Sequence, residues 1–596
     1  MTKPIPFASY IVKRLQQLNC FSIHGVPGDF FLRALDHIHA DGGAGTKWIG
    51  NASELCAGYA ADGYARAAMR CGVRSHPNIP FKPAVGALLT TYGVGELSAM
   101  NAIAGSYAES VPVIHMVGTP SRKAMASGDP RRPVHHSLGD GNMEIWAEMT
   151  KKITCAQAYL HREPSGVAAA ERFDSVLEQA VLQSKPVYAS IPSDLIDAEV
   201  PADMLETPLR LELPPNDRET EDMLIEHLLD RIRSAKSPLI IADGLSYPFR
   251  LREPLNNLVR ATGIRAMSYM SGKGVIEEDG NACWDPRLPN TTEESLNADF
   301  VMYSGPLLAD TNTARWSAIP PCRDNVYFNL DTVQVSDQAY KIRSLGLLTK
   351  LLDRLKYESI PKRIDWTDKE AREEVESQCI DDGPRSYPAG AKITQDEFWS
   401  TVSSSLRAND LVLLANGTPL LGGRQLRLDY NSTVIASSIW CSIGQMLPAA
   451  QGAAAAFRDF GHPGKVILFE GDGSFQVTCQ AISDIIRNKL DVTVFIVNNK
   501  GYTYERWLNG MKAQYNDVPD WKYTEAPRFF GADEAVHTAR RIETMEDLLE
   551  VVEDEYHRPP LANPRLRIYD VVMEPEDVPE KSKAGLLAAS EALRSG

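Results

Sequence analysis

Short apolar runs alternate with longer segments of helical period along the whole chain of 596 residues. In the first third, helical patterns cover 7–19 and 53–70, and apolar runs cover 87–91 and 113–117. The later apolar runs lie at 238–242, 300–304, 326–330, 411–414, 434–437, 465–470 and 492–498. This alternation is typical of parallel sheets joined by helices, so the pattern predicts an α/β fold.

The alternation falls into three blocks, which are the expected domains, because one hydrophobic core does not serve a chain of this length. We expect an N-terminal α/β domain over 1–196, a central α/β domain over 197–360, a linker over 361–391, and a C-terminal domain with a tail over 392–596. A proline-studded acidic stretch at 201–221 predicts a further linker. The polar, turn-rich segment 71–83 predicts an exposed loop.

Composition and charge narrow the class of protein. The formal charge is −16, from 62 basic and 78 acidic residues. This balance argues against nucleic acid or an anionic membrane as the main partner, since both need a basic face. The nine cysteines are scattered without a C-x-x-C pair, and neither a signal peptide nor a membrane-spanning run is evident. We therefore expect a cytoplasmic protein with free thiols.

The strongest motif follows the apolar run 465–470. It consists of Gly471-Asp472-Gly473-Ser474, and the next apolar run ends in Asn498-Asn499. Two parallel strands of a β-α-β unit end at the same sheet edge, so Asp472 and Asn499 are expected to converge there. Their oxygens, together with the carbonyl of Gly501, suit Mg²⁺ that also binds a phosphate. Alone, Gly471–Ser474 would indicate only an ordinary turn.

The segment GDG, followed after 24 residues by NN, resembles the diphosphate motif of thiamine-diphosphate enzymes. The resemblance implies thiamine diphosphate and Mg²⁺ as cofactors and three α/β domains: pyrimidine-binding, central and diphosphate-binding. It implies Asp472, Asn499 and Gly501 as metal ligands. The expected contacts of the diphosphate are Thr418, Gly471, Gly473, Ser474 and Asn499.

The N-terminal block resembles the pyrimidine-binding domain of this family over Gly50–Arg66. Without the resemblance, Glu54 would be read as a carboxylate that stabilises the start of a helix. The resemblance instead implies that Glu54 is catalytic and bonds N1′ of the aminopyrimidine. In the segment 435–444, it implies that Ile443 separates the two cofactor rings and that Cys441 holds the pyrimidine through its carbonyl. It also implies a homodimer or homotetramer with active sites between subunits.

Further residues select the reaction. His135-His136 within VHHSLGDGN is similar to the adjacent-histidine motif of the pyruvate and indolepyruvate decarboxylases. Asp29 and Glu505 match the acidic residues of that family's active site. Taken singly, these residues would suggest a surface histidine pair, a turn aspartate and a solvated helix face. The resemblance implies that the four are catalytic and handle protons near the substrate.

The resemblance implies non-oxidative decarboxylation of a small 2-oxo acid, foremost pyruvate, to the aldehyde and CO₂ through a thiamine-diphosphate ylide. Tyr504 and Leu420 depart from the family's pocket, so phenylpyruvate and indolepyruvate remain alternative substrates. An acyloin-forming carboligase is a second alternative, and a non-catalytic cofactor-binding regulator is a third.

Overall fold

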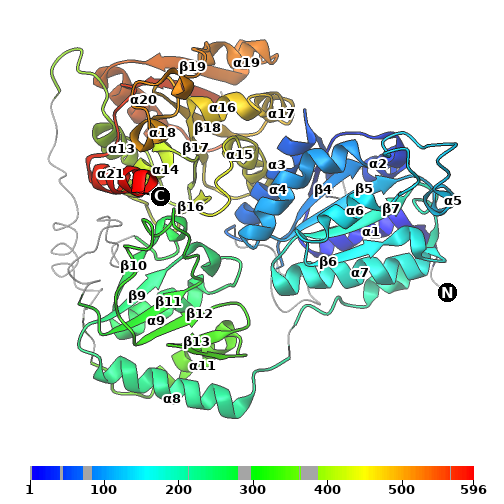
Figure 1. Ribbon diagram of the computed structural model, residues 1–596, viewed down its shortest axis with the longest axis horizontal. Coiled ribbons are helices and arrows are strands. Elements are labelled where there is room, and N and C mark those ends of the chain that lie inside the picture. Colours follow the sequence, from blue (N-terminus) through cyan, green and yellow to red (C-terminus); the bar gives the residue numbers. More distant parts are fainter. Residues whose placement is uncertain are drawn as a thin grey trace.

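Three six-stranded sheets form the framework of the protein in the computed structural model (Figure 1). The structure describes residues 3–40, 45–71, 83–212, 214–278, 297–361, 363, 387–563 and 565–595. The expected loop at 71–83 and the expected linker at 361–391 lie mostly outside these ranges. The first and third sheets share one continuous hydrophobic core, and the central sheet has a core of its own.

The N-terminal sheet has the order β3-β2-β4-β5-β7-β6, and all of its strand pairs are parallel. Its strands are β2 (Ser22–Gly25), β3 (Lys47–Gly50), β4 (Gly86–Thr91), β5 (Val113–Thr119), β6 (Ala156–Tyr159) and β7 (Val187–Pro192). Its helices are α1 (Phe7–Gln17), α2 (Leu32–Ala40), α3 (Glu54–Ala68), α4 (Val94–Ala108), α5 (Arg122–Ser127), α6 (Ile145–Thr150) and α7 (Gly166–Gln183). The parallel sheet predicted for this block is confirmed.

The C-terminal sheet is also entirely parallel, with the order β16-β15-β17-β18-β20-β19. Its strands are β15 (Leu411–Leu414), β16 (Thr433–Ala436), β17 (Val466–Gly471), β18 (Val492–Asn498), β19 (His537–Ile542) and β20 (Leu566–Val572). Its helices are α13 (Gln395–Ser403), α14 (Thr418–Gly422), α15 (Met446–Phe460), α16 (Asp472–Thr478), α17 (Ala481–Arg487), α18 (Thr503–Leu508), α19 (Ala526–Phe529), α20 (Met545–His557) and α21 (Glu580–Ser595).

The central sheet is mixed, which corrects the expectation of a purely parallel block. Its order is β10-β9-β11-β12-β13-β14. Its strands are β9 (Pro238–Ala242), β10 (Arg265–Ser268), β11 (Phe300–Ser304), β12 (Asn325–Phe328), β13 (Val333–Val335) and β14 (Gln338–Tyr340), with helices α8 (Arg218–Ser234), α9 (Arg252–Thr262) and α11 (Ser344–Leu355). The last two strands add antiparallel because short turns join them, and such turns cannot make a parallel crossover.

The linker predicted between the first two blocks differs from the structure. The expected linker 201–221 begins inside β8 (Glu199–Pro201), which pairs with β1 (Pro4–Pro6), and it ends inside α8. Two acidic residues read as linker, Glu219 and Glu221, lie in the first turn of α8, and Asp217 caps this helix by accepting a hydrogen bond from the Thr220 amide at 3.0 Å. Between β17 and β18 the chain forms two short helices, α16 and α17. Cys479 and Gln480 between them keep right-handed helical angles, so the helical period runs through the break.

Helices α3 and α15 join the N-terminal and C-terminal blocks (Figure 1). Their backbones approach so closely that a Cβ atom at Gly63 would lie 2.1 Å from the carbonyl oxygen of Ala449. At Gly452 it would lie 1.8 Å from the carbonyl oxygen of Ala60. Glycine and alanine along both helices therefore permit a contact that larger side chains would block.

Two further observations concern the described residues alone. Their seven cysteines are all free thiols. Among the helices in these ranges, none is long and apolar enough to cross a membrane.

Candidate active site

Asp472 stands at the carboxyl end of β17, where the next strand of the sheet also ends. Its carboxylate accepts hydrogen bonds from the amides of Gly473 at 2.7 Å and Gly501 at 2.9 Å. The residue is only 2% exposed, and burial raises the pKa of its carboxyl to about 7. A buried carboxylate of this kind is stabilised by a nearby cation, which is the role expected of Mg²⁺.

Asn499 follows β18 and reaches the start of α14. Its side-chain nitrogen donates to Oγ1 of Thr418 at 3.3 Å, which leaves the amide oxygen directed away from that bond. The structure therefore brings Asp472, Thr418, Asn499 and Gly501 together from three separate loops. This convergence follows from the parallel order of β15, β17 and β18.

These residues surround a cavity of about 210 Å³. Its lining includes Thr418, Cys441, Ile443, Gly471, Asp472, Gly473, Ser474, Asn499, Gly501 and Glu505, all of them candidates from the sequence. The sequence did not indicate Met270 and Thr311 of the central block, which complete the wall. These two residues belong to no short motif. They line the cavity only because the central block packs against this edge of the C-terminal sheet, which the sequence does not show.

The donors and acceptors of the cavity fit a magnesium diphosphate group. Asn416 lines the cavity, and neither polar atom of its buried amide has a hydrogen-bond partner among the described residues. A buried unpaired amide is costly, and a bound phosphate oxygen would accept a hydrogen bond from its nitrogen. The hydroxyls of Thr418 and Ser474 add polar contacts, while Asp472 and the oxygen of Asn499 suit the cation.

A buried glutamate that the sequence analysis missed shapes the loop bearing Cys441 and Ile443. Oε1 of Glu109 accepts hydrogen bonds from the Ser437 hydroxyl at 2.7 Å and from the amides of Ser438, Ile439 and Trp440 at 3.2–3.3 Å. Its Oε2 accepts from Arg66 at 2.8 Å. In the sequence Glu109 follows a helical segment without any motif. Its contacts with the C-terminal block could therefore not be predicted from neighbouring residues.

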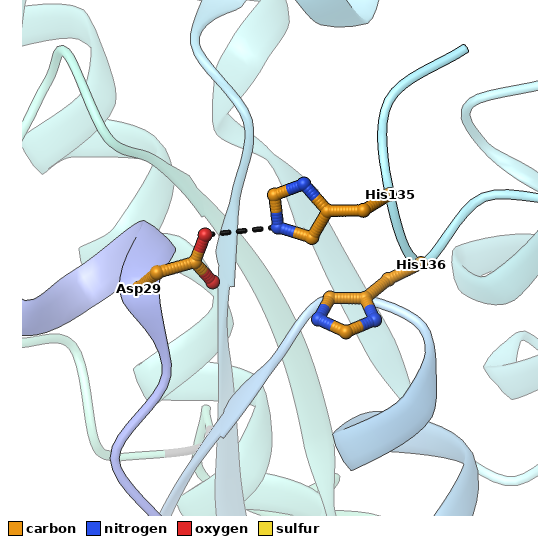
Figure 2. Close-up of side chains that lie close together, drawn as sticks. All are labelled: Asp29, His135 and His136. Carbon is orange, nitrogen blue, oxygen red and sulfur yellow. Dashed lines mark hydrogen bonds and ion pairs between the residues drawn. The ribbon is translucent and has the colours of Figure 1, made fainter.

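The histidine pair meets Asp29 in the N-terminal block, as Figure 2 shows. Nε2 of His135 lies 2.9 Å from Oδ2 of Asp29, and one nitrogen or oxygen atom from each of the three residues lies within 4.8 Å of the others. Phe30 stacks on His135 with ring centroids 4.8 Å apart. Trp146 donates to the carbonyl of His136 at 3.1 Å, which anchors the loop. The cluster thus brings one carboxylate and two imidazoles together.

Glu54 is the first residue of α3, and Ser53 caps this helix by accepting a hydrogen bond from the Cys56 amide at 3.3 Å. The Glu54 carboxylate faces Gly95, where a Cβ atom would lie 3.1 Å from Oε1. In the described part of the chain, neither Glu54 nor the cluster of Asp29, His135 and His136 lines the 210 Å³ cavity. One chain therefore presents two separate groups of candidate residues.

Comparison with known proteins identifies both ends of the chain. Residues 6–143 match the family described as thiamine pyrophosphate enzyme, N-terminal TPP binding domain, and residues 418–561 match the corresponding C-terminal TPP binding domain. A pyruvate decarboxylase of Aspergillus parasiticus is 35% identical over 97% of this chain and 96% of its own length. Pyruvate decarboxylase isozyme 1 of Saccharomyces cerevisiae is 33% identical over 99% of both.

Proposed function

The chain belongs to the thiamine-diphosphate-dependent decarboxylase family that includes the fungal pyruvate decarboxylases, and on this premise we propose that it converts pyruvate to acetaldehyde and CO₂. Its cofactors are thiamine diphosphate and Mg²⁺. The observation that carries the proposal is that one chain holds both a polar cavity suited to magnesium diphosphate and a cluster of acid–base groups.

We assign the cavity residues as follows. Asp472, Asn499 and the carbonyl of Gly501 hold Mg²⁺, because hard oxygen ligands suit this cation. The diphosphate is held by Thr418, Gly471, Gly473, Ser474 and Asn499. The carbonyl of Cys441 and the side chain of Ile443 position the aminopyrimidine, and Glu109 supports their loop.

Bound thiamine diphosphate supplies the nucleophilic carbon and the electron sink for loss of the substrate carboxylate. Glu54 holds a proton at N1′ of the pyrimidine. Asp29, His135, His136 and Glu505 orient the substrate, and one of them delivers the proton to the carbon that becomes the aldehyde. The apolar side chains of Leu420 and Ile443 exclude water from that carbon.

We further propose that the active form is at least a homodimer, in which the N-terminal block of one subunit faces the cavity of another. Two observations support this arrangement: Glu54 does not line the cavity of its own chain, and Ile439 and Ile443 beside the cavity are 47% and 40% exposed. Exposed apolar side chains next to a site favour burial against a partner. The free thiols of the described residues support a location in the reducing cytoplasm.

The test is release of CO₂ and acetaldehyde from pyruvate by purified protein supplied with thiamine diphosphate and Mg²⁺. Glu54→Gln should lower the rate by at least about 100-fold, because it removes an acid–base group that acts on the cofactor. Removal of Mg²⁺ with a chelator should abolish turnover, and added Mg²⁺ should restore it. Cofactor binding without CO₂ release would contradict the proposal, and acyloin in place of free acetaldehyde would favour the carboligase.

A further inference from the structure

Within the part of the chain that the structure describes, Arg424 is a buried cation without a counter-ion. It follows α14 in the short 3₁₀ turn Gly423–Gln425 and is 7% exposed. Among the described residues no carboxylate pairs with it, and its Nε makes no hydrogen bond. Burial lowers the pKa of its guanidinium to about 10. An unpaired charge in such a place is destabilising unless a ligand compensates it.

Other buried arginines of the protein show the usual arrangement. Arg14 is 2% exposed and pairs with Asp174 at 2.7 Å. Arg66 is 7% exposed and pairs with Glu109 at 2.8 Å. Arg424 is as buried as Arg66, so the absence of a paired carboxylate among the described residues is a local feature of this site.

Three residues argued to lie beside Arg424 line the 210 Å³ cavity. Its Nη2 lies 3.7 Å from the sulfur of Met270, and Tyr504 lies within electrostatic range of the guanidinium. Leu420 precedes Arg424 by four residues, which in a helical turn brings the two side chains to one face. Arg424 therefore stands directly behind the wall that Met270, Leu420 and Tyr504 form.

That wall can open at one point. Methionine is unbranched and flexible, so the Met270 side chain can rotate and expose the guanidinium to the cavity. Asp472 and Asn499, which we assign to the cofactor, line the same cavity. A substrate held at the cofactor would then have Arg424 within reach of its far end.

We propose that Arg424 binds a second carboxylate at the far end of the substrate, so that the enzyme also accepts 2-oxo dicarboxylic acids; this inference rests on the proposed function. A guanidinium binds a carboxylate through two parallel hydrogen bonds, which suits a planar anion better than an alkyl end. For 2-oxoglutarate the bond between C1 and C2 breaks and CO₂ leaves. The carbon that was C2 takes up one proton, which gives succinic semialdehyde.

The experiment compares 2-oxoglutarate with 2-oxopentanoate, which has the same number of carbons and no second carboxylate. We expect the wild type to turn over 2-oxoglutarate with a kcat/KM at least equal to that for 2-oxopentanoate. Arg424→Met should lower the ratio of kcat/KM for 2-oxoglutarate to kcat/KM for 2-oxopentanoate at least about 100-fold, since an unpaired carboxylate in a closed site is strongly disfavoured. Arg424→Lys keeps the charge and should retain part of the preference.

Pyruvate serves as the reference substrate that separates the two proposals. Turnover of pyruvate without turnover of 2-oxoglutarate by the wild type would overturn the role of Arg424 and leave the proposed function intact. If the ratio of the two kcat/KM values is the same in Arg424→Met and the wild type, the proposed role of Arg424 is overturned as well. Failure with all three substrates would instead overturn the proposed function. If Arg424→Met does not fold, the wild-type ratio and Arg424→Lys decide the outcome.

Discussion

At the scale of single residues, Glu96 links the packing of the N-terminal block to pH. It is fully buried and accepts hydrogen bonds from the Gly93 amide at 2.8 Å and the Tyr188 hydroxyl at 2.9 Å. Burial raises the pKa of its carboxyl from 4.5 to about 7. The folded protein therefore holds this proton more tightly than the unfolded chain does. The stability that the protonated Glu96 contributes is lost as the pH rises from 4.5 to about 7.

We expect this single group to lower the free energy of unfolding by about 3 kcal/mol between pH 4.5 and pH 7. Glu96→Gln cannot titrate, so the variant should lose this part of the pH dependence. Urea unfolding at several pH values measures the slope. Glu171→Gln, an exposed change on α7, is the control and should leave the slope unchanged. A slope that is equal in the wild type and Glu96→Gln would contradict the prediction.

At the scale of elements, the close approach of α3 and α15 fixes how the N-terminal and C-terminal blocks meet. Gly452→Ala would place a methyl group against the backbone of Ala60, so the helices must move apart. We expect a loss of about 1–3 kcal/mol of stability, the usual cost of overpacking. Gly585→Ala in α21, where nothing lies within 4 Å of the new Cβ, is the matched control and should be neutral or slightly stabilising. Thermal unfolding compares the two, and equal midpoints would refute a tight contact.

Some strands and contacts could be predicted from the sequence, and others could not. Strands such as β15 and β18 were predictable because a fully buried parallel strand is a continuous apolar run. The meeting of Asp472 with the loop after β18 was predictable because sheet order decides it. The contacts of Glu109 and Arg424 were not, since they depend on how separate blocks pack. The antiparallel end of the central sheet was missed because β13 and β14 are only three residues each.

At the scale of the whole molecule, the separation of the two candidate groups bears on assembly. Glu54 lies on the N-terminal block, and Asp472 lies in the cavity of the C-terminal block. If each active site formed within one chain, a variant in either residue would disable its own site whatever its partner. If each site forms between chains, two different variants can complement each other.

We therefore expect Glu54→Gln and Asp472→Asn to be inactive alone and active when co-expressed or reassembled together. A heterodimer has one site with both substitutions and one site with neither. Random pairing makes half of the dimers mixed, so activity should return to about one quarter of the wild type. A mixture of Glu54→Gln with Glu54→Asn is the control and should stay inactive, because no pairing restores an intact site. Mixed dimers can be isolated with two different affinity tags. If sites form between subunits, each such dimer must contain one site with both native residues. Lack of activity in these dimers would therefore refute a shared site.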